Sequence, residues 1–191
     1  EDQKEPWKQS VSVSKKLVGA MPKSLTVTLA NLIYFENGGI IYGVKHDGTN
    51  LPGFPKTVPN WIYGAPIVAD IDGDSQLEII IGEYGSSPTP YFSIFAYNID
   101  GSFVTDFPTG PFHGSANQIT VADIDNDNQF EIIFDENVSE AGLGRYRALN
   151  MDATNVTGWP LELSQNTSFQ QPLLGDLNND GLPEVFFTAN Q

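Results

Sequence analysis

Three short segments of the chain place oxygen-bearing side chains at alternating positions. Residues 70–78 read DIDGDSQLE, residues 123–131 read DIDNDNQFE, and residues 176–184 read DLNNDGLPE. Acidic or amide side chains recur at positions 1, 3, 5 and 9 of each segment. Carboxylates this close together repel one another unless a cation lies among them. The three segments therefore predict three cation sites.

The predicted ligands are all oxygen atoms, from four side chains and the backbone carbonyl of position 7 in each loop. The three sets are Asp70, Asp72, Asp74, Gln76 and Glu78; Asp123, Asp125, Asp127, Gln129 and Glu131; and Asp176, Asn178, Asp180, Leu182 and Glu184. Ca²⁺ takes about 6 to 8 oxygen ligands, and Mg²⁺ prefers to keep several waters. Zinc and copper favour sulfur or imidazole. We expect about three Ca²⁺ sites, the third weaker because Asn178 is neutral.

The acidic segments have two other interpretations. A helix-flanked calcium loop of the EF-hand type begins with the same spacing but closes with Glu at position 12. Here the closing Glu is at position 9, and the residues that follow, EIIIG and EIIF, are typical of strands. An acidic, solvated turn that binds nothing stays open as an alternative.

The acidic segments belong to a longer repeat. Asp70, Asp123 and Asp176 are spaced by 53 residues, and a second set of similar segments begins at residues 42, 95 and 147. Each unit contains four predicted strands: one before the acidic loop, one at 78–82, one around 91–97 and a short one before Phe107-Pro108. Tandem four-stranded units of this length are typical of β-propeller blades. The fold class expected is all-β, a β-propeller or a propeller fragment with 53-residue repeats.

The units can be assigned along the chain. Residues 1–24 form an N-terminal segment with a degenerate first strand, and residues 25–56, 57–109, 110–161 and 162–191 form a partial blade, two complete blades and a second partial blade. The first blade lacks an acidic loop and should bind no calcium. Because a single-chain ring needs about 4 to 8 blades, we expect either a piece of a longer protein or chains that associate through open blade edges.

The acidic segments resemble those of a known family. VADIDGDSQLEIIIG, VADIDNDNQFEIIF and LGDLNNDGLPEVFF are similar to the loops of FG-GAP, or VCBS-type, repeats in integrin-α-like propellers. The resemblance covers about residues 25–191 and implies a calcium-stabilised propeller in a secreted or cell-surface protein. Glu at the ninth position, and Ser75 and Asn126 where such loops usually have Gly, depart from the pattern.

Composition excludes several classes of function. The formal net charge is −15, from 24 acidic and 9 basic side chains, which opposes binding to nucleic acid. The chain has no cysteine and no apolar run of about 18 residues that would span a membrane.

A ligand-binding face is expected at the loops opposite the acidic ones. Its candidate residues are Trp61, Tyr63, Tyr84, Phe112, His113 and Phe169, whose aromatic side chains suit a glycan or protein ligand. Packing between blades is the alternative for each of them. No catalytic motif is present, although Glu83 and Glu140 lie on the same face.

We therefore expect a non-catalytic, extracellular binding or scaffold module for adhesion or for carbohydrate or protein recognition. The alternatives are part of a secreted hydrolase or polysaccharide lyase, and a spacer within an adhesin.

Overall fold

The computed structural model describes residues 26–28, 38–85, 91–116, 118–138, 143–168 and 170–190. These residues form antiparallel sheets and no helix, so the protein is all-β in the part described. The N-terminal segment predicted at residues 1–24 lies outside the described residues.

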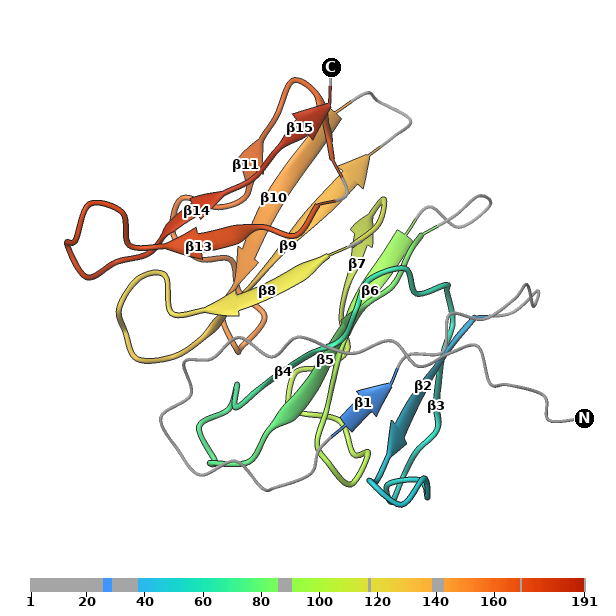
Figure 1. The fold of residues 1–191 in the computed structure, drawn as a ribbon. Coiled ribbons are helices and arrows are strands. Elements are labelled where there is room, and N and C mark those ends of the chain that lie inside the picture. The colour runs from blue at the N-terminus through green and yellow to red at the C-terminus, as the bar shows by residue number, and fades with distance from the viewer. Residues whose placement is uncertain are drawn as a thin grey trace, which may run out of the picture.

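Three of the sheets contain three or four strands (Figure 1). Sheet 1 has the order β1 (Thr26–Thr28), β2 (Gly39–Val44), β3 (Lys56–Val58). Sheet 2 has the order β4 (Ile67–Ala69), β5 (Glu78–Gly82), β6 (Tyr91–Tyr97), β7 (Thr109–His113). Sheet 3 has the order β8 (Ile119–Ala122), β9 (Glu131–Val138), β10 (Leu143–Leu149), β11 (Leu161–Glu162).

The C-terminal strands form two smaller pairs. Sheet 4 consists of β13 (Leu173–Gly175) and β14 (Glu184–Phe186), with Leu173 opposite Phe186. A separate pair joins β12 (Asn166–Thr167) to β15 (Ala189–Asn190).

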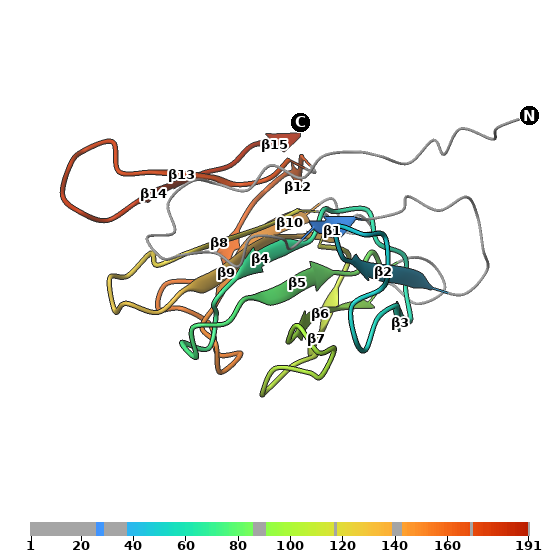
Figure 2. The same cartoon turned by 60° about the horizontal axis from the view of Figure 1, so that its bottom comes forward.

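Neighbouring sheets pack face to face, in chain order. Ile79 and Ile81 of β5 share one core cluster with Ile41 of sheet 1, whereas Ile80 between them shares a second cluster with Ile132 of sheet 3. A third cluster joins sheet 3 to sheet 4. All five residues of β5 are buried, because successive side chains on a strand point to opposite faces and both faces of sheet 2 are covered. Figure 2 shows sheet 4 as an outer layer of the molecule.

The fourth strand of sheet 2 differs from the prediction. The sequence suggested a short strand before Phe107-Pro108, but β7 follows these residues, and the segment before them contributes only a bridge between Tyr97 and Phe103. The sequence TGPFH of β7 contains Gly and Pro, which are poor strand formers in isolation. Its pairing with β6, which includes an irregularity between Phe92 and Ile94, places it in the sheet.

The interface between sheets 2 and 3 should dominate stability. Phe134 is fully buried there, with its ring centroid 5.9 Å from that of Phe92 and 5.3 Å from that of Phe112. Phe134→Ala should lower the free energy of unfolding by about 3 to 5 kcal/mol in urea denaturation, because it leaves a cavity. The control Phe103→Ala removes a ring that is 51% exposed and should cost about 1 kcal/mol. Equal losses in the two variants would contradict this packing.

Candidate metal centre

The three acidic loops connect the first two strands of sheets 2, 3 and 4, and they lie on the same side of the molecule in Figure 1. In each loop the first aspartate organises the backbone. Asp70 accepts hydrogen bonds from the N–H groups of Gly73 (2.9 Å) and Ser75 (3.0 Å), and Asp123 accepts the corresponding bonds from Asn126 (2.6 Å) and Asn128 (3.1 Å). These bonds curl each loop around its own carboxylates.

The loop backbone requires residues that tolerate a left-handed conformation. Positions 4 and 6 have positive φ angles in all three loops, at Gly73, Asn126 and Asn179 and at Ser75, Asn128 and Gly181. Gly and Asn adopt this region readily, whereas other residues do so at a cost. Ser75, with φ of 69°, is therefore the strained member of the set.

The closing glutamates lie at the start of the second strand, where the loop meets the core. Glu78 is 0% exposed and Glu131 is 1% exposed. One oxygen of Glu78 accepts a hydrogen bond from the Ile71 N–H (2.8 Å), and Glu131 accepts one from the Ile124 N–H (2.7 Å). The other oxygen of Glu78, Oε1, is buried and has no hydrogen-bond partner. Such an oxygen is unfavourable unless something else satisfies it.

Nearby carboxylates increase this cost. Burial raises the pKa of Glu78 to about 7, and the nearby Asp72, Asp70 and Asp74 add to the shift. Burial likewise raises the pKa of Glu131 to about 7, with Asp125, Asp127 and Asp123 contributing. A bound cation would oppose all of these effects, because it favours the ionised form of each carboxylate.

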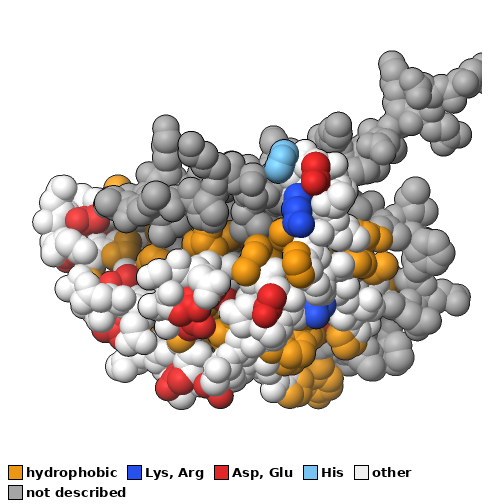
Figure 3. Space-filling model, turned by 90° about the horizontal axis from the view of Figure 1, so that it is seen from below, with side chains coloured by type: hydrophobic (Ala, Val, Ile, Leu, Met, Phe, Trp, Pro, Cys, Tyr) orange, Lys and Arg blue, Asp and Glu red, His pale blue; other side chains and the backbone are white. Residues whose placement is uncertain are grey.

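Two groups of carboxylates converge closely enough to share one ion. Atoms of Asp70, Asp72 and Glu78 lie within 4.8 Å of one another, as do atoms of Asp123, Asp125 and Asp127. The second loop also borders an open pocket of about 230 Å³. The pocket is lined by Asp125, Asp127, Gln129, Glu131, Asn150, Met151 and Asp152. Figure 3, viewed from below, shows several acidic side chains on the surface and few basic ones.

Asp74 of the first loop and Glu131 of the second are predicted ligands that lie outside these two groups. Asp74 accepts hydrogen bonds from the backbone N–H and the side-chain amide of Gln76, and Asp127 is bonded in the same way by Gln129. The coordinating role predicted for the carbonyls of Gln76, Gln129 and Leu182 stays a prediction.

The third loop is organised differently. The amide nitrogen of Asn178 donates to Asp180 (3.0 Å) and to Glu184 (2.7 Å), so an N–H group stands where the other loops have a carboxylate. Asp176, Asn178 and Asp180 are exposed. Among the described residues, only the first two loops bring three carboxylates together.

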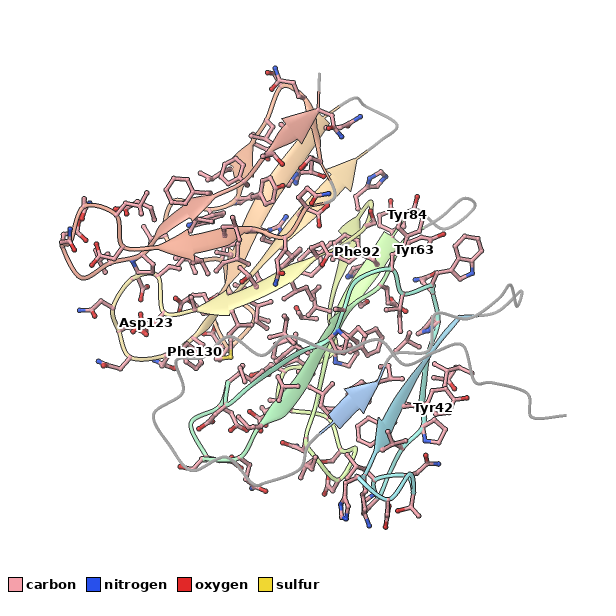
Figure 4. The ribbon with its side chains drawn as sticks, viewed as in Figure 1. Tyr42, Tyr63, Tyr84, Phe92, Asp123 and Phe130 are labelled. Atoms are coloured by element: carbon pink, nitrogen blue, oxygen red, sulfur yellow. The ribbon has the colours of Figure 1, made fainter. Side chains whose placement is uncertain are left out.

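The predicted aromatic residues separate into two environments. Trp61, Tyr63 and Tyr84 form a surface cluster, in which the rings of Trp61 and Tyr84 are nearly parallel and Tyr63 meets both edge-on. Figure 4 places Tyr63 and Tyr84 together, away from Asp123 of the second acidic loop. His113 packs against Tyr91, and Phe112 packs into the core between sheets 2 and 3. Phe169 lies outside the described residues.

Two buried carboxylates near the ends of β5 and β9, Glu83 and Glu136, have a structural role that the sequence analysis does not predict. Glu83 is 1% exposed and accepts hydrogen bonds from the N–H groups of Asn60 (2.8 Å) and Ser93 (3.1 Å). Glu136 is held by Arg147 (2.8 Å) and accepts a bond from the His113 N–H (3.2 Å). Glu83 and Glu136 are 53 residues apart, and this spacing is the feature of the sequence that indicates equivalent positions in the repeat. Glu140 lies outside the described residues.

Stacked antiparallel sheets, with acidic loops between the first two strands of sheets 2, 3 and 4, define an all-β protein with candidate cation sites. Residues 70–134, from the first acidic loop into β9, match the family model of the FG-GAP-like repeat. The chain therefore contains an FG-GAP-type repeat in this region. Comparisons with curated proteins and with solved structures gave no match. In the described part of the chain, no helix is long and apolar enough to cross a membrane.

The strain at Ser75 can be tested by substitution. Ser75→Gly should raise the free energy of unfolding in chelator by about 1 kcal/mol, because Gly adopts a positive φ angle without steric cost. The control Asn128→Gly, at the equivalent position of the second loop, should gain less because Asn already tolerates this conformation. Chemical denaturation measures both. A loss of stability in Ser75→Gly, or an equal gain in the two variants, would contradict the assignment.

Proposed function

We propose that this chain is a calcium-stabilised, non-catalytic binding module of a secreted or cell-surface β-propeller protein. Its first two acidic loops hold Ca²⁺ with the higher affinity, and the third loop binds more weakly. The ions rigidify the hairpins beside the core, and the opposite end of sheet 2 binds the ligand.

The unpartnered oxygen of Glu78 carries the proposal. One oxygen of Glu78 is buried without a hydrogen bond, and a carboxylate oxygen of the same residue lies within 4.8 Å of Asp70 and Asp72 atoms, which suits a cation that bonds to all three side chains. The equivalent Glu131 has the same burial and the same raised pKa. No group of three carboxylates converges in the third loop among the described residues, and the Asn178 amide is bonded to Glu184 there, which supports weaker binding.

Calcium fits these groups better than other common ions. The donors are carboxylate oxygens from neighbouring positions of one loop, and no His or Cys stands among them. Hard divalent ions prefer such oxygens, and calcium accepts their irregular geometry. An ion that binds only the folded state stabilises it by about 2.7 kcal/mol per site at a concentration of about 100 times Kd.

Glu78→Gln should change stability in opposite directions with and without calcium. In chelator at pH 8 the variant should melt at a higher temperature than the parent. Burial raises the pKa of the Glu78 carboxyl group to about 7, so this group is mostly ionised at pH 8, and the substitution removes its buried charge. In excess calcium it should melt at a lower temperature, with a calcium Kd weakened at least about tenfold at that site.

The matched control is Glu162→Gln, whose side chain is 62% exposed and lies on β11 of sheet 3. It should leave both melting temperatures nearly unchanged. Thermal unfolding in chelator and in calcium, with calorimetric titration, measures these effects. A parent protein whose melting temperature does not respond to chelator would refute the proposal.

The surface aromatic cluster favours a glycan as the ligand. Tyr63 is 56% exposed and Trp61 is 37% exposed, beside the nearly parallel ring of Tyr84. The negative faces of aromatic rings attract the polarised C–H groups of a sugar ring. The net charge of −15 disfavours acidic glycans, so neutral ones are expected.

Trp61→Ala should abolish binding to neutral glycans on an array, because it removes one of the two parallel rings. Phe103→Ala, which removes an exposed ring from the turn after β6, should retain binding. Chelation should weaken binding only where it also unfolds the protein. Binding that survives Trp61→Ala, or no glycan binding by the parent, would redirect the search to protein ligands without affecting the calcium proposal.

A further inference from the structure

Sheet 4 presents an apolar surface that no described element covers. Leu173, Leu177 and Phe186, called here the trailing face, are 69%, 70% and 45% exposed. Leu173 and Phe186 are directly opposite each other on β13 and β14, and Leu177 follows in the acidic loop. The other face of sheet 4 is covered by sheet 3, because Leu174 and Val185 pack against Ile133 and Ala148.

The corresponding positions of sheets 2 and 3 are covered by the sheet that follows. Ile133 and Ile80 lie one and two 53-residue repeats before Phe186, and both are 0% exposed. Ile80 packs against sheet 3, and Ile133 packs against sheet 4. At the position of Leu177, Ile71 and Ile124 join the same two clusters. At the positions of Leu177 and Phe186, the trailing face therefore matches an interface that is already formed twice within this chain.

The other end of the stack carries the complementary surface. Ile40, Tyr42 and Val44 of β2, called here the leading face, alternate with Ile41 and Gly43. Because Ile41 packs toward sheet 2, the leading face points away from it. Its residues are half-buried. In sheet 2 the equivalents of Tyr42 and Val44 are Phe95 and Tyr97, which pack against sheet 1.

We propose that the trailing face binds the leading face of a second copy of this chain, head to tail. The contact reproduces the face-to-face packing between consecutive sheets. It uses sheet faces rather than the strand edges that the sequence suggested. Such a heterologous contact closes into a ring or extends, depending on the rotation between copies. High ionic strength should strengthen it by screening the net charge of −15.

Mixing two blocked variants tests this arrangement. Phe186→Glu places a charge on the trailing face, and Tyr42→Glu places one on the leading face. Each variant alone should sediment as a monomer, because one half of the contact is lost. An equimolar mixture should form a dimer and nothing larger, since one trailing face and one leading face remain intact. The unsubstituted chain should associate beyond a dimer, or form a closed ring, as its concentration rises.

Controls separate the alternatives. Leu161→Glu changes an exposed leucine on the edge strand β11 and should associate like the parent. If Tyr42→Glu does not fold, judged by circular dichroism, Val44→Glu replaces it. A parent that stays monomeric, association that survives Phe186→Glu, or dimers formed by either leading-face variant alone would overturn the proposal. Association lost in Leu161→Glu would assign the contact to strand edges instead and would also overturn it.

Discussion

The structure depends on a carboxylate placed where an acidic loop enters the hydrophobic core. Glu78 begins β5, and its neighbour Ile79 is fully buried between sheets 1 and 2. Glu131 begins β9, beside the fully buried Ile132. A charge in this position is costly, and Oε1 of Glu78 lacks even a hydrogen bond. The same placement couples the loop to the core, so whatever neutralises the glutamate also orders the strand that follows it.

Each sheet also depends on its neighbours to bury its apolar side chains. Each internal sheet has two apolar faces, and β5 is buried along its whole length only because sheets 1 and 3 lie on either side. Hydrogen bonds from buried polar side chains then fix the positions of the segments that border each sheet. Glu83 ties the segment at Asn60 to sheet 2, and Asp135 accepts hydrogen bonds from Gln118 and from Thr167. Stability, loop order and the arrangement of the candidate ligand surface therefore rest on contacts between consecutive sheets.

Local sequence patterns predicted much of this arrangement. Runs such as EIIIG and EIIF, bounded by Asp, Asn and Gly, predicted strands, and the all-β class followed from them. The strand β7 was misplaced because TGPFH has little strand character and is held by its pairing with β6. The 53-residue spacing of Glu83 and Glu136 marks them as part of the repeat, but the structural role of Glu83 depends on its burial and on partners from distant segments. In the third loop, Asn178 suggested weaker binding, but the bond from its amide to Glu184 required the three-dimensional arrangement.

Crystallographic anomalous scattering from calcium-saturated crystals tests the central claim most directly. The account predicts a peak among Asp70, Asp72 and Glu78, about 2.3 to 2.6 Å from Oε1 of Glu78, and a second peak in the loop closed by Glu131. Saturating calcium with no anomalous peak in either loop, and water or an internal hydrogen bond at Oε1 instead, would contradict it.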